Sequence, residues 1–102
     1  MTSIVFGSYN EGRWVSICGH AGYAEHGKDI VCAGVSITAQ ALAATLSQTE
    51  GVMCDVKTED GRMFIVCRPI SRVKRYVDAL FDMAHTAFEL LAEEYPEHVK
   101  LA

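Results

Sequence analysis

The stretch VMCDVKTEDGRMFIVCR, residues 52–68, contains the clearest secondary-structure signal of this chain. Two strand-like runs, 52–58 and 62–68, stand on either side of a turn around Asp60-Gly61. An Asp-Gly pair between two such runs favours a tight turn, because glycine adopts backbone conformations that other residues avoid. The stretch therefore predicts a β-hairpin.

A second hairpin is predicted nearer the amino end. An apolar run is followed there by the turn-forming cluster GSYNEG, residues 7–12, and then by RWVSICGH, residues 13–20. The simplest interpretation is a pair of strands near residues 2–7 and 13–19. This pattern does not determine the register of the pair.

Two further segments have helical periodicity. In residues 33–48 the apolar positions recur at intervals of three and four, and Gly51 is placed to end the helix. The apolar positions of this first helix are Val35, Ala39, Leu42 and Leu46. Beyond Pro69, which ends the preceding strand, Ser71 is expected to cap a second helix that stops before Pro96. The apolar positions of the second helix are Val73, Val77, Leu80, Ala84, Phe88 and Leu91.

This order of elements predicts an α/β fold of the α+β type. We expect the order ββαββα, with one four-stranded sheet made from two hairpins and packed with two helices. The chain has 102 residues, of which 50% are hydrophobic, so residues 1–102 have the size of a single domain. Four short strands leave two sheet edges, and an edge or a helix face is a reasonable site for dimerisation.

Composition restricts the function classes. The net charge of −4 argues against nucleic acid as the main ligand, because phosphate binding needs clustered Lys and Arg. We find no signal-like segment and no run of about 18 apolar residues, so a cytoplasmic location without a membrane is expected. Free thiols are therefore expected at all four cysteines, with Cys54 and Cys67 as buried strand residues. The four are Cys18, Cys32, Cys54 and Cys67.

The stretch GHAGYAEHGKDIVCAGVS, residues 19–36, carries the residues suited to chemistry. It crosses the end of a predicted strand, a loop and the start of a predicted helix. Cys32, in the first helical turn, lies at the positive end of the helix dipole, which favours a thiolate over a thiol. His20, across the loop, is the nearest strand-held candidate to accept the thiol proton. Three glycines allow this loop to turn sharply, approach a substrate or move. They are Gly19, Gly22 and Gly27.

The other polar residues have less specific interpretations. Asp29 is suited to capping the first helix, and equally to orienting the ring of His20. His26 is expected to be a solvated loop residue. His85 and His98 are expected to lie at the surface, in or after the last helix.

A metal site is an alternative for the same stretch. Cys18, His20, His26 and Cys32 offer four zinc ligands within fifteen residues. Their spacing matches none of the paired arrangements that are typical of zinc sites, so no metal is expected. Cys18 is also a possible redox neighbour of Cys32.

Strand alternation raises a problem for His20. If Val15 and Ile17 face the core, His20 lies on the opposite face and points away from Cys32. A bend at Gly19 resolves this, since a glycine at a strand end often redirects the next side chain. Alternatively, Trp14 and Cys18 face the core, and the Val15 face is covered by a dimer partner or by the second helix. The sequence leaves both alternatives open.

With these residues placed, residues 19–36 resemble the signature of the bacterial ribosomal-processing cysteine proteases. In that family a G-H-A segment precedes a G-x-D-I-V-C-A-x-V-S segment, and both occur here without a gap. The resemblance implies a homodimeric α/β cysteine endopeptidase that needs no cofactor. Its family substrate is a ribosomal protein precursor, large-subunit protein twenty-seven, from which a short N-terminal extension is cut after an aromatic residue.

Carried over by position, the resemblance implies that Cys32 is the nucleophile and His20 the general base. It also implies that Asp29 and Ser36 are supporting residues: Asp29 holds the imidazole or the loop, and Ser36 bonds near the thiolate. We expect acyl transfer, with backbone N–H groups at the helix start stabilising the oxyanion. The alternative from another class is a non-catalytic, ribosome-associated binding module with the same fold.

Overall fold

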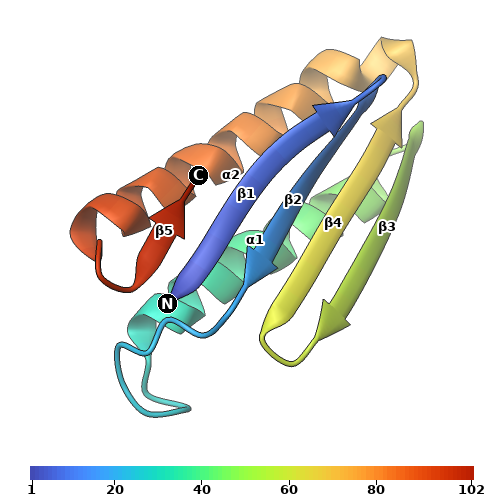
Figure 1. Cartoon of the computed structure of the whole chain (residues 1–102). Helices are drawn as coiled ribbons and strands as arrows, with labels where there is room; N and C mark the ends of the chain where they lie inside the picture. The colour runs from blue at the N-terminus through green and yellow to red at the C-terminus, as the bar shows by residue number, and fades with distance from the viewer.

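The computed structural model describes the whole chain, residues 1–102. The elements are β1 (Thr2–Tyr9), β2 (Gly12–Cys18), α1 (Ile30–Gln48), β3 (Val52–Glu59), β4 (Arg62–Pro69), the 3-10 turn η1 (Ser71–Val73), α2 (Lys74–Glu94) and β5 (Val99–Leu101). Both predicted hairpins and both predicted helices are present. Figure 1 shows one sheet with the two helices lying together behind it.

The sheet has five strands rather than the predicted four. Their order is β3-β4-β2-β1-β5, with β2 pairing antiparallel to both β1 and β4. The short strand β5 pairs parallel to β1, with Thr2 opposite Val99. A three-residue strand is too short to show an alternating pattern, and its partner lies at the far end of the chain. The expectation of a four-stranded sheet was wrong for this reason.

The core lies between the sheet and the helices. Alternate residues of the central strands point toward the helices, and Ile4, Val15 and Ile65 are completely buried there. They meet the fully buried rings of Phe81 and Phe88 from α2. Each such side chain stabilises the fold by roughly 1.5–3 kcal/mol relative to an exposed one. One cluster of 17 buried residues therefore supports the whole domain.

The two helices begin in different ways. Helix α1 begins at Ile30, ahead of the periodic residues 33–48, because the carboxylate of Asp29 caps it by accepting from backbone N–H groups that follow. Ser71 does not cap α2 and lies instead in η1, which leads into α2 without a side-chain cap. Near the end of α1, Gly51 has a φ of +84°, a backbone conformation that favours glycine.

Helix α1 contains no charged residue and is long and apolar enough to cross a membrane by length and composition alone. In this fold it packs beside α2 on one face of the sheet, with its buried side formed by residues such as Val31, Val35 and Leu46. Core helices of this kind pass the same test, so the composition is weak evidence for a membrane span.

Candidate active site

The register of β2 answers the question of where His20 points. Val15 and Ile17 are buried against the helices, so strand alternation alone would direct His20 to the other face. The strand ends at Cys18, and Gly19 follows with a φ of +91°. A Cβ at Gly19 would collide with the carbonyl oxygen of Met1. Gly19 therefore bends the chain, as one of the two sequence interpretations required, and the His20 ring lines the same cavity as Cys32.

Two neighbouring segments hold the bend after β2. The N–H of Gly19 donates to the carbonyl of Gly61 at 2.7 Å, and the nitrogen of Met1 donates to the carbonyl of His20 at 2.7 Å. The backbone on both sides of the His20 ring is thus tied to β1 and to the β3–β4 turn. The ring itself remains 61% exposed and free to change rotamer.

The carboxylate nearest His20 belongs to the β3–β4 turn. Nε2 of His20 lies 3.6 Å from Oδ1 of Asp60, and the two groups form an ion pair when the ring is protonated. A Cβ at Gly61 would come within 3.1 Å of the same nitrogen, so glycine leaves room for the ring. The Asp60-Gly61 pair therefore forms the hairpin turn and also contacts the ring of His20.

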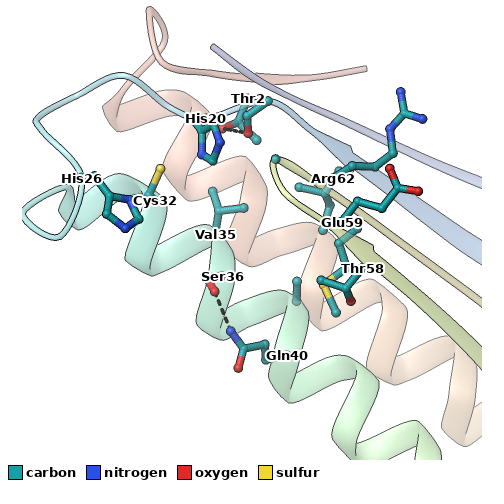
Figure 2. A pocket seen from close by; sticks show the side chains of 15 residues that line it. Thr2, His20, His26, Cys32, Val35, Ser36, Gln40, Thr58, Glu59 and Arg62 are labelled. Atoms are coloured by element: carbon teal, nitrogen blue, oxygen red, sulfur yellow. Dashed lines mark hydrogen bonds between the residues drawn. The ribbon is translucent and has the colours of Figure 1, made fainter.

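Cys32 lies in the first turn of α1, at the mouth of a cavity of about 550 Å³. Its Sγ accepts a hydrogen bond from the backbone N–H of Ala21 at 3.3 Å. Figure 2 shows the sulfur and the ring of His20 over the same cavity, with His26 on its loop side. The ring and the sulfur are not hydrogen-bonded to each other. An N–H donor directed at the sulfur stabilises a thiolate more than a thiol.

Asp29 holds the loop rather than the imidazole. Its Oδ1 accepts from the N–H groups of Val31 and Cys32, and its Oδ2 accepts from those of Tyr23 and Ala24. Burial alone raises the pKa of Asp29, but these four backbone donors outweigh it, so the pKa lies below its ordinary value of 3.8. The capping interpretation is confirmed, and no bond joins Asp29 to His20.

The backbone N–H groups at the start of α1, which were expected to stabilise the oxyanion, already have hydrogen-bond partners. The N–H groups of Val31 and Cys32 are bonded to the Asp29 carboxylate, and that of Ala33 donates to the Asp29 carbonyl at 3.0 Å. Three donors of the first turn are therefore already occupied. The N–H of Ala21, directed at the sulfur from outside the helix, is the donor that the structure presents at Cys32.

Ser36 and the loop glycines also have defined positions. Ser36 lines the cavity, but its Oγ accepts from Nε2 of Gln40 at 2.6 Å and makes no bond to Cys32. The expected bond between Ser36 and the thiolate stays a prediction, because an Oγ that accepts from Gln40 still has its own O–H to donate. Gly22 and Gly27 have φ values of +70° and +88° with open space around them, so the loop's path requires them for conformation rather than close packing.

The zinc arrangement does not form. Cys18 is on the β2 face opposite the buried Ile17, where its nearest polar partner is Ser16 Oγ at 3.8 Å. It is therefore separated by the sheet from Cys32, and no three His, Cys, Asp or Glu side chains gather as metal ligands. The same separation removes Cys18 as a redox neighbour of Cys32.

The other two cysteines occupy the buried side of the β3–β4 pair. Cys54 and Cys67 lie opposite each other in register, and both are unpaired. Burial raises the pKa of the Cys67 thiol to about 11, and burial also raises the pKa of the Cys54 thiol. Both thiols are therefore protonated at neutral pH and are poor nucleophiles.

Sequence reasoning missed three residues that lie around His20 and Cys32. Asp60 and Gly61 were assigned only to the hairpin turn, and His98 only to the surface. The ring of His98 is in fact partly buried, with its Nδ1 3.0 Å from the carbonyl oxygen of Ala21. No local pattern signals these contacts, because β2 pairs with β4 and β1 with β5 only in the folded sheet.

A thiol and an imidazole placed around one open cavity are characteristic of cysteine proteases. The comparison with protein families agrees, since the family described as cysteine protease Prp matches residues 1–100. The protein is a cysteine protease. The chain belongs to the Prp family.

Solved structures show the same fold. The chain is similar to the essential ribosomal processing protease Prp from S. aureus, in complex with a covalently linked product peptide, with 24% identity and a TM-score of 0.84 over 99% of this chain and 97% of that one. The same protease with a substrate peptide gives 23% identity and a TM-score of 0.79, covering 100% and 98%. SMU.848 from Streptococcus mutans is 29% identical, with a TM-score of 0.73 over 99% and 91%. No curated protein sequence matches this chain.

Proposed function

We propose that this protease removes the N-terminal extension of large-subunit ribosomal protein twenty-seven, with Cys32 as nucleophile and His20 as general base. The observation that carries the catalytic assignment is the bond from the Ala21 N–H to the Cys32 sulfur, at the mouth of a cavity that His20 also lines. The S. aureus relatives, described as ribosomal processing proteases and holding peptides, support a peptide substrate from the ribosome.

The proposed chemistry is acyl transfer. His20 takes the thiol proton, and the sulfur of Cys32 attacks the carbonyl carbon to form a C–S bond. The Ala21 N–H stabilises the negative charge that develops beside the sulfur. The imidazolium then gives its proton to the leaving amine as the C–N bond breaks. Water, deprotonated by His20, hydrolyses the thioester and restores the thiol.

The proposed chemistry requires the His20 ring to move. In the structure it faces the Asp60 carboxylate, and its large exposure allows the rotation that brings it to the sulfur. We therefore assign Asp60 the role of holding His20 between turnovers.

The cavity suits the aromatic residue before the cleaved bond that the family resemblance implies. Its apolar lining is contributed by β2, α1 and β4, which together form a floor between the helix and the sheet. The lining includes Ile17, Val35, Ala39 and Met63. Polar residues, among them Gln40, Glu59 and Arg62, lie around this floor. An aromatic side chain before the scissile bond fits an apolar floor with a polar rim.

Intact mass measurement tests the proposal directly. The purified protein is incubated with ribosomal protein twenty-seven carrying its extension, and the loss of the extension is followed over time. We expect cleavage by the wild type, none by the Cys32→Ala variant and unchanged cleavage by the matched control Cys18→Ala. A folded wild type that leaves the extension uncut overturns the substrate assignment. Equal cleavage by the Cys32→Ala variant overturns the assignment of the nucleophile.

We also propose that the enzyme acts in the cytoplasm as a homodimer, without a nucleic-acid or membrane ligand. The family resemblance supports the dimer. The net charge of −4 supports a protein rather than a nucleic-acid partner.

A further inference from the structure

We propose that His98 is a positioning residue for the active site. It holds the carbonyl of Ala21 so that the N–H of the same residue stays directed at the Cys32 sulfur. This inference rests on the proposed function of Cys32, and it gives the turn between α2 and β5 a role in catalysis as well as in folding.

Two hydrogen bonds fix Ala21 from opposite sides. Its N–H lies 3.3 Å from Sγ of Cys32, and its carbonyl oxygen lies 3.0 Å from Nδ1 of His98. A carbonyl oxygen only accepts, so Nδ1 carries the hydrogen in both the neutral and the protonated ring. The side chain of Ala21 is 1% exposed and packs in the core. With three anchors, this residue has little freedom to turn its N–H away from the sulfur.

His98 is itself held by elements far from the loop. Its carbonyl accepts from the N–H of Thr2 at 2.9 Å, and its N–H donates to the carbonyl of Tyr95 at 2.9 Å. Its ring meets that of Tyr23 edge to face at 5.4 Å, and Tyr23 also meets Tyr95 at 5.2 Å. The turn between α2 and β5 thus clamps the loop just after Ala21.

The clamp matters because the rest of the loop is exposed. Asp29 secures the loop through the N–H groups of Tyr23 and Ala24, but it makes no bond to Ala21. Without the His98 donor, the peptide that carries the Ala21 N–H keeps only the bond from the Met1 nitrogen to the carbonyl of His20 and the packing of the Ala21 side chain. We therefore expect the loss of the donor to weaken the bond to the sulfur, and hence the stabilisation of the thiolate.

Alkylation by iodoacetamide tests this without any substrate. The rate at Cys32 is measured by peptide mass spectrometry at pH 6 and pH 9, in wild type, His98→Phe and His98→Asn. The Phe variant keeps the ring against Tyr23 and loses the donor, whereas the side-chain amide of Asn places an N–H near the position of Nδ1. We expect the Phe variant to be slower than wild type by about fivefold or more at pH 6, with little change at pH 9. We expect the Asn variant to recover most of the rate.

A packing control separates this role from simple support of β5. Val99→Ala loosens the strand that directly follows His98, because Val99 is buried, but leaves the His98 donor in place. His20 and His26, the other imidazoles that line the cavity, are unchanged in every variant. His98→Ala provides the same measurement if the Phe variant does not fold.

The outcomes distinguish the two proposals. Selective alkylation of Cys32 in wild type, with no change in His98→Phe at pH 6, overturns the positioning role and leaves the proposed function intact. An equal loss in Val99→Ala also overturns it. A wild type in which Cys32 reacts no faster than Cys54 and Cys67 overturns both proposals.

Discussion

At the scale of single residues, Asp29 links the fold to the site. One carboxylate starts α1, places Cys32 in its first turn and secures the loop that follows His20. Its four backbone donors are bonds to a charged acceptor, which are stronger than bonds between neutral groups. Because the N–H groups of Val31 and Cys32 are bonded to this carboxylate, they are not free to bind an oxyanion. The donor at the sulfur comes from Ala21 instead.

We predict that Asp29→Asn lowers the free energy of unfolding by about 1 kcal/mol at neutral pH. The folded-state pKa of Asp29 lies below its ordinary value of 3.8, so its charge stabilises the fold above that value. This contribution is lost as the pH falls through the lower, folded-state pKa. Urea denaturation should therefore show the variant and wild type converging in strongly acidic buffer. A difference that stays constant with pH would contradict the charge-based account.

At the scale of elements, Arg13 joins β2 to α2. Its guanidinium lies 3.0 Å from the carboxylate of Asp78, which Lys74 also reaches at 3.0 Å, and it stacks over the ring of Phe81 at 5.0 Å. Burial raises the pKa of Asp78, but the hydrogen bonds from Lys74 and Arg13 outweigh it, and the pKa is lowered. The contact fixes the helix over the strand that leads to His20.

We predict that Arg13→Met destabilises the fold by about 1 kcal/mol, because a partly buried ion pair and a cation–π contact are lost together. Arg68→Met is the matched control, since Arg68 is exposed on the neighbouring strand β4 and makes no ion pair. Denaturant midpoints should fall for the first variant and stay nearly unchanged for the second. Equal shifts would show that the β2–α2 contact contributes nothing specific.

At the scale of the whole molecule, the outer surface of the helix layer is unusually apolar. Ile37 on α1 and Met83 and Leu90 on α2 are all more than half exposed. Between the two helices runs a groove whose lining is mostly hydrophobic. A contiguous apolar face of this kind is typical of an interaction surface.

We expect sedimentation velocity to show a dimer, and Met83→Lys to convert it to a monomer, since a buried charge without a partner opposes association. Met53→Lys is the control, because Met53 is equally exposed but lies on the edge strand β3. A monomeric wild type would contradict the homodimer. A dimer that persists in Met83→Lys while Met53→Lys is monomeric would place the interface at the sheet edge.

Local patterns were sufficient for much of this protein. The two hairpins, the two helices and the signature around Cys32 follow from turn residues, periodicity and spacing, all of which act between residues close in the chain. The bend at Gly19 was one of the two alternatives that alternation in β2 left open, and the structure decides between them. Asp29 as a helix cap belongs to the same group, since its partners lie within six residues.

The partners of the active-site residues could not be predicted from local patterns and are seen only in the folded chain. The β2–β4 pairing brings Asp60 to His20, and the parallel pairing of β5 with β1 brings His98 to Ala21 across 77 positions of sequence. The side chain of Ser36 accepts from Gln40, a contact that the sequence reasoning did not predict. Secondary structure is governed by neighbours along the chain, whereas the partners of an active-site group are chosen by sheet order and packing, which bring distant residues together.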